Sequence, residues 1–243
     1  MGKGPDRRGE SSLSDTEEER LRRVIVDFRF LLERGYPFDS ALRFVGNHHQ
    51  LPSQQRNIVA RVLSRFDGIT ERRRHRVDLD GVAGHVLAID GLNQLITIET
   101  ALQGGPLIRG ADGCIRDAEL VGGKYKTSGR TMQALRLVYD LLAEHRPAEV
   151  VWVLDAPVSG SGNLAVLIRQ VGSGQDWRVE VVASPDAVLA QMDDAVVVSS
   201  DAVVLDHCDA WMVLVDEVID RNELHPVVLD FDERYQSDEV SSR

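Results

Sequence analysis

Asp90, Asp155 and Asp201 each follow a short apolar run, and this pattern has the clearest potential for chemistry in the sequence. Runs of this length, such as residues 85–89, are typical of buried parallel strands. Parallel strands bring their carboxyl ends to one edge of a sheet, where open α/β proteins bind their ligands. We therefore expect the three carboxylates to converge at that edge.

Carboxylate oxygens are the ligands that Mg²⁺ or Mn²⁺ prefers, so the sequence predicts one of these ions as a cofactor. Two such ions, about 3.5–4 Å apart, can activate a water and stabilise the leaving oxygen during phosphodiester hydrolysis. Candidates for a fourth acid, which the sequence does not rank, are Glu99, Asp112, Asp117 and Asp206. The alternative is that each strand-end aspartate only caps the helix that follows it.

A turn rich in serine and glycine follows Asp155. Ser159, Ser161 and Gly162 could present backbone N–H groups to a phosphate at the start of the next helix. It is not a Walker motif, because no Gly-Lys-Ser/Thr follows. The alternative is an ordinary strand-to-helix turn.

Basic residues supply further candidates for nucleic-acid contact. Lys124 and Arg130 lie in a polar segment, where a solvated loop is the alternative. Arg56, Arg61 and Arg65 lie on or beside an expected N-terminal helix, where a solvated face is the alternative. Residues 20–76 carry thirteen arginines against five acids, so this segment could hold a polyanion; the alternative is that charged surfaces simply differ between the two parts of the chain.

The charge of the whole chain points in the opposite direction. The 243 residues have a net charge of -11, and residues 81–243 carry twenty-six acids against twelve basic residues. A basic module is thus joined to an acidic one. No apolar run approaches the ~18 residues that span a bilayer. Because the first residues also lack the apolar segment of a signal peptide, we expect a cytoplasmic protein without a membrane partner.

Apolar periodicity predicts an α/β protein, with a parallel-sheet α/β/α sandwich preceded by a small all-α domain. Within the sandwich, residues 107–117 predict a hairpin or an exposed loop, and 211–215 and 227–231 predict the last two strands. The expected organisation is a disordered tail at 1–16, a basic helical domain at 17–70, a linker or edge strand at 71–84, the α/β domain at 85–232 and a disordered tail at 233–243.

Two short motifs resemble those of the PIN-like nucleases, particularly their NYN branch. Ile89–Asn93 resembles the opening motif of that superfamily, and Val198–Asp201 resembles its late strand, so the resemblance covers residues 85–216. It implies a parallel α/β/α sandwich and metal-dependent RNA cleavage. It further implies that Asp90, Asp155 and Asp201 bind the metal and that Asn93 orients Asp90.

The whole chain also resembles an uncharacterised prokaryotic family with a helical domain before this α/β domain. The shared elements are Arg34–Pro37 and Asp155–Gly162. The 104–130 insertion departs from a typical PIN-like nuclease and puts the position of the fourth acid in doubt.

These observations predict a metal-dependent nuclease that acts on RNA rather than DNA. One alternative is a non-catalytic nucleic-acid-binding or adaptor protein on the same fold. A second is a small-molecule phosphohydrolase or nucleotide-binding enzyme that uses Asp90 and the 159–163 loop. A homo-oligomer is left open by the sequence.

Overall fold

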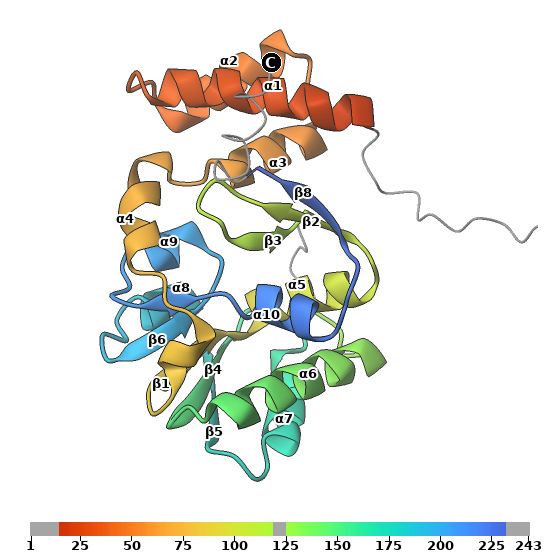
Figure 1. Ribbon diagram of the computed structural model, residues 1–243, viewed down its shortest axis with the longest axis vertical. Helices are drawn as coiled ribbons and strands as arrows, with labels where there is room; N and C mark the ends of the chain where they lie inside the picture. The colour runs from red at the N-terminus through yellow and green to blue at the C-terminus, as the bar shows by residue number, and fades with distance from the viewer. Residues whose placement is uncertain (1–14, 119–124, 232–243) are drawn as a thin grey trace, which may run out of the picture.

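The computed structural model describes residues 15–118 and 125–231 (Figure 1). The helices α1–α3 lie at one end of the molecule, and a small sheet separates them from a larger α/β layer. The expected tails and Lys124 fall outside the described residues, except that α1 already begins at Asp15. No helix within the described ranges is long and apolar enough to cross a membrane.

The N-terminal helices form because apolar residues recur at helical spacing and bury one face. In α1, Leu21, Val24 and Phe28 are completely buried against the other two helices. The helices of this region are α1 (Asp15–Leu32), α2 (Phe38–His48), α3 (Ser53–Val62), the 3₁₀ helix η1 (Phe66–Gly68) and α4 (Ile69–Arg74).

The segment 71–84, which the sequence assigned to a linker or an edge strand, is partly helical. It contains the end of α4 and the 3₁₀ helix η2 (Leu79–Val82), and the Arg72 side chain is completely buried. Arg76 follows the edge-strand alternative, because its backbone forms an isolated parallel bridge with Trp211 at the edge of the larger sheet. Arg72 belongs to a run of three arginines, which is typical of solvated surface, but Asp112 and Asp206 from distant segments pair with its buried charge.

The larger sheet has five parallel strands in the order β5-β4-β1-β6-β7. This confirms the parallel α/β sheet that the sequence predicted. Leu87, Ala88 and Ile89 of the central strand are completely buried, which explains the unbroken apolar run. The strands are β1 (Val86–Asp90), β4 (Glu149–Asp155), β5 (Trp177–Val182), β6 (Ala195–Val198) and β7 (Trp211–Met212).

Helices flank this sheet and complete the α/β sandwich. Helices α5, α6, α7 and α10 pack against one another, whereas α8 contacts β1, β4 and α9. Helix α10 occupies residues that the sequence assigned partly to a strand, because only Trp211 and Met212 pair with β6. The helices are α5 (Gly91–Leu102), α6 (Gly129–His145), α7 (Ser161–Val171), α8 (Pro185–Leu189), α9 (Ala202–Leu205) and α10 (Leu214–Arg221).

A second sheet, ordered β3-β2-β8, joins the two parts of the molecule. Strands β2 (Pro106–Arg109) and β3 (Ile115–Asp117) form the predicted hairpin, and β8 (Val227–Asp230) pairs parallel with β2. Adjacent residues of β2 face different cores: Leu107 packs with the α/β core and Ile108 with the helical core. The hairpin is therefore buried, and the helical region depends on later parts of the chain for its core.

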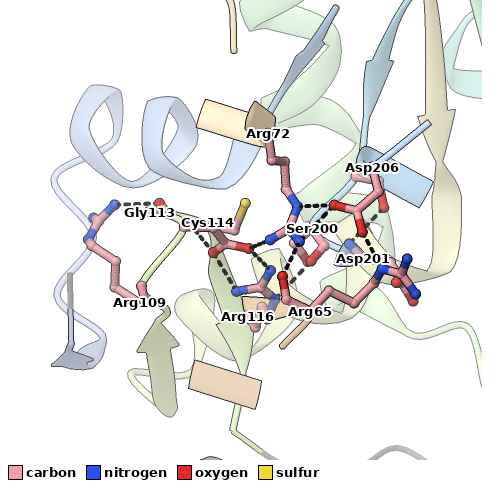
Figure 2. Close-up of polar contacts among 12 residues, drawn as sticks. Arg65, Arg72, Arg109, Gly113, Cys114, Arg116, Ser200, Asp201 and Asp206 are labelled. Atoms are coloured by element: carbon pink, nitrogen blue, oxygen red, sulfur yellow. Dashed lines mark hydrogen bonds and ion pairs between the residues drawn. The ribbon is translucent and has the colours of Figure 1, made fainter. Parts of the chain in front are cut away.

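Buried ion pairs fasten the same junction (Figure 2). Arg72 of α4 donates to Asp112 in the hairpin at 2.7 Å and to Asp206 after α9 at 2.9 Å. Arg116 of β3 makes a second, bidentate pair with Asp112. Burial alone would raise the pKa of Asp112, but Arg116 and Arg72 outweigh it and lower that pKa to about 2.

Arg72→Met tests this junction. We expect a loss of about 3–5 kcal/mol in the free energy of unfolding, because Asp112 and Asp206 lose a buried partner. Arg74→Met is the matched control, since Arg74 lies on the same helix and pairs with Glu71 while 69% exposed. Urea denaturation measures both variants. Equal losses in the two variants would show that the buried pair does not fasten the junction.

Candidate functional site

The three aspartates singled out in the sequence lie at the carboxyl ends of neighbouring strands. Strand β1 lies between β4 and β6, so Asp90 lies between the other two in the sheet order. Asp90 is in register with Val153, and β4 continues for two more residues to Asp155. Two residues correspond to about 6.5 Å of strand, so Asp155 is displaced along the sheet from Asp90.

Two of these acids also cap helices, which is the alternative that the sequence left open. Asp90 Oδ1 accepts a hydrogen bond from the Asn93 backbone N–H at 3.4 Å and caps α5. Asp201 Oδ1 accepts from the Val203 N–H at 2.7 Å and caps α9. The other Asp90 oxygen, Oδ2, accepts from the Ser199 hydroxyl at 2.9 Å. Ser199 therefore fixes the orientation of Asp90 from the end of β6.

The acids repel one another electrostatically. Burial raises the pKa of Asp90 to about 7, and the charges of Asp186 and Asp201 add to this rise. Hydrogen bonds from Ser199 and Asn93 act in the opposite direction. The pKa of Asp186 is itself raised by burial and by the charges of Asp201 and Asp155. We call Asp90, Asp155, Asp186 and Asp201 the acid cluster.

Asp186 is the member that our sequence interpretation missed. It lies at the start of α8, four residues after the end of β5. The rule used for the other three acids, an acid following a parallel strand, would have found it. Over the residues that the structure describes, no three His, Cys, Asp or Glu side chains are close enough to hold a metal ion. Metal binding by these acids therefore stays a prediction.

A polar cavity of about 270 Å³ adjoins the cluster and reaches the helical region. Asp201 and Asn93 line its sheet side, Arg61 and Ser64 enter from the end of α3, and Arg116 and Asp117 come from β3. We call it the first cavity. Burial lowers the pKa of Arg61, whereas the charges of Asp117 and Asp201 partly restore it. A guanidinium and a strand-end carboxylate thus face one small volume.

The predicted role of Asn93 is correct only in part. Its backbone orients Asp90, but its side chain turns toward β6. There Asn93 Oδ1 accepts from the Ser200 N–H at 3.1 Å and from the Ser200 hydroxyl at 2.9 Å. On the opposite side of Ser200, Arg116 Nε donates to the Ser200 carbonyl at 2.8 Å (Figure 2). Asn93 and Arg116 together fix the backbone that carries Asp201.

The four candidates for an additional acid have separate surroundings. Asp112 and Asp206 are held in the arginine network of the junction. Glu99 accepts hydrogen bonds from Tyr125, which precedes α6, and from Thr131, in the first turn of α6. Asp117 alone lines the first cavity, where its carbonyl accepts from Arg61.

The expected phosphate-binding turn is held mainly by its own contacts. The buried Ser161 hydroxyl donates to the Asp155 carbonyl at 2.6 Å and to the Val158 carbonyl at 3.0 Å, so it closes the turn. Ser159 and Gly162 are exposed, and the Ser159 carbonyl accepts from the Tyr125 N–H. This arrangement favours the ordinary-turn alternative for Ser161.

The basic residues that the sequence proposed for nucleic-acid contact also lie in different parts of the structure. Arg56 donates to Leu51 and Asn47, so it braces the α2–α3 connection away from the cavity. Arg130 is exposed at the start of α6. Arg65 pairs with Asp206 while its side chain is half exposed. Of the basic candidates among the described residues, Arg61 is the one that lines the first cavity.

Comparisons with known proteins agree with this two-part architecture. Residues 79–217 match a family described as a domain of unknown function (DUF5616), and residues 20–75 match one described as a protein of unknown function (DUF434). The chain belongs to the DUF5616 family. It is 33% identical over 185 residues to "Uncharacterized protein MJ0935" from Methanocaldococcus jannaschii, covering 76% of this chain and 88% of that protein. No solved structure is found to match the chain.

The raised pKa of Asp90 makes a prediction about stability. An unfolded aspartate has a pKa of about 3.9, so between that pH and about 7 the folded protein binds more protons than the unfolded chain. Folding stability due to Asp90 should therefore fall as the pH rises through this window. Asp90→Asn removes the titration and should stabilise the metal-free protein by on the order of 4 kcal/mol at pH 8, with little effect near pH 4.

Thermal unfolding in EDTA, followed from pH 4 to pH 8, measures this difference. Asp193→Asn is the control, because Asp193 is exposed in the turn before β6. If the stabilities of Asp90→Asn and the natural protein differ by the same amount at both ends of the pH range, the interpretation of Asp90 is wrong.

Proposed function

We propose that this protein is a metal-dependent nuclease that acts on RNA rather than DNA. One observation carries the proposal: Asp90, Asp155 and Asp201 lie at or just beyond the ends of neighbouring strands at one edge of the parallel sheet, where burial, with a smaller contribution from the other acids of the cluster, raises the pKa values of Asp90 and Asp186. The arginine-lined first cavity beside them supports it, because a phosphodiester needs a cationic partner near the acids.

The donor chemistry of the cluster fits Mg²⁺ or Mn²⁺, since all four side chains offer hard oxygen ligands. Asp90 and Asp201 would hold the ion, with Asp155 or Asp186 approaching from the adjacent segments. When bound, such an ion would lower the pKa of a water and neutralise charge on a phosphate. Ser199 would keep Asp90 oriented by its 2.9 Å hydrogen bond, and Arg61 would bind a phosphate oxygen.

The two motifs that resemble those of PIN-like nucleases also support a nuclease. Under this resemblance, Ile89–Asn93 and Val198–Asp201 would be the two acid-bearing segments of such a nuclease. In the structure they lie side by side, because β1 pairs with β6. A cytoplasmic location belongs to the same proposal, since RNA is the expected substrate.

The second candidate is a non-catalytic nucleic-acid-binding protein. It is favoured by the capping bonds of Asp90 and Asp201, which give both acids a structural role without a metal. Such a protein would bind RNA equally well with and without a divalent cation.

Manganese binding and cleavage together test the nuclease. Calorimetric titration with MnCl₂ should show saturable binding in the natural protein, weakened at least tenfold in Asp90→Asn and Asp201→Asn. The same two variants should lose cleavage of a labelled RNA by 100-fold or more, because each removes a charged ligand. Asp193→Asn, an exposed acid outside the cluster, should match the natural protein in both measurements.

Two outcomes count against the nuclease. Manganese binding that is indifferent to Asp90 and Asp201 would remove the metal site from the acid cluster. RNA binding that is unaffected by manganese, with no cleavage in any variant, would favour the non-catalytic candidate.

A further inference from the structure

Three cavities lie in succession from the acid cluster across the helical region. The first cavity shares Ser64 with a second of about 720 Å³, which is bounded by the α1–α2 turn and η1. The second shares Leu32, Gly35, Phe66 and Asp67 with a third of about 680 Å³ beside α4. Because neighbouring cavities share lining residues, they lie next to one another, and we call this row of cavities, which begins at Asp201, the track.

Three aromatic residues line the second cavity, and two of them, Phe38 and Phe66, are partly buried against the helical core. Tyr36 follows Gly35 in the turn between α1 and α2 and is 55% exposed, although it lines the cavity. An open aromatic ring at a cavity wall offers a stacking surface for a base, which is worth about 1–3 kcal/mol per base.

Charge along the track is mixed rather than strongly positive. The arginines that line it are Arg29, Arg61, Arg65, Arg73, Arg74 and Arg116. The acids are Glu33, Asp67, Asp117, Asp201 and Asp206. A duplex, whose bases are stacked inward, binds chiefly through its phosphates and would gain little from this balance. A single strand can present a phosphate to an arginine and a base to Tyr36 in turn.

We propose that the track holds a single strand of nucleic acid, with one base stacked on Tyr36 and the backbone leading past Arg65 and Ser64 to Arg61 and Asp201. This inference rests on the proposed nuclease function in one respect only, namely that the bound strand leads to the acid cluster. It identifies the substrate as single-stranded, whether free or in a loop. It also gives the helical region a role in holding the strand.

Binding without divalent metal tests the track separately from catalysis. Fluorescence anisotropy in EDTA, with labelled 12-nucleotide RNA, its DNA equivalent and the matching RNA duplex, compares the natural protein with Tyr36→Ala. We expect single-stranded RNA to bind more tightly than the duplex. Loss of the stacking surface should weaken single-strand binding roughly 5-fold or more and leave duplex binding unchanged. The DNA arm shows whether the sugar is distinguished.

Phe44→Ala is the matched control. Phe44 is 64% exposed on α2, lines none of the three cavities and should bind each oligonucleotide as the natural protein does. A second variant, Arg61→Gln, should weaken single-strand binding at the other end of the track. Equal effects of Tyr36→Ala and Phe44→Ala, or tighter binding of the duplex, would overturn the track. Single-strand binding that depends on Tyr36, in a protein that never cleaves, would leave the track standing and remove the nuclease.

Discussion

The arrangement of the two parts of the molecule depends on the buried guanidinium of Arg72. Arg72 is completely buried and comes from the N-terminal region, whereas its partners Asp112 and Asp206 come from the hairpin and from the segment after α9. A buried guanidinium without these acids would cost several kcal/mol, so the three segments must meet in one arrangement. Apolar packing at the small sheet is less directional, because Ile108 and Leu229 need only be covered. The ion pairs therefore specify how the helical region sits on the α/β region.

That constraint extends to the acid cluster through one residue. Arg116 shares Asp112 with Arg72 and also holds the Ser200 carbonyl, next to Asp201. The position of a strand-end carboxylate thus depends on how well the N-terminal region is docked. The acids could sit at the edge of an isolated sheet, but the arginine-lined cavity beside them exists only when α3 and β3 are both in place.

The sequence predicted the parts of the fold that arise from local periodicity. The parallel strands of β1, β4 and β6 and the 107–117 hairpin are confirmed, because unbroken apolar runs and glycine-bounded turns carry their own signal. The buried position of Arg72 was missed, since a run of three arginines looks like solvated surface until the distant acids that pair with Arg72 are known. The side chain of Asn93 was expected on Asp90 but contacts Ser200, because only the register of β1 against β6 places that partner within reach.

Capping and catalysis make the same demand on Asp90, and this explains why neither sequence nor local geometry separates them. Both need a carboxylate at the end of a strand with its oxygens facing the next helix. Capping does not require other acidic side chains near the capping carboxylate. A cap is most stable as a charged carboxylate with no other anion nearby, whereas Asp90 lies near Asp186 and Asp201 and has a pKa of about 7. Ser199, which donates to one oxygen of Asp90, limits this cost without removing it. Asparagine caps a helix as well as aspartate does, so capping alone does not account for the acidic charges around Asp90. The crowding of acidic charge, rather than the capping bonds, is what supports the proposal that the cluster binds a cation.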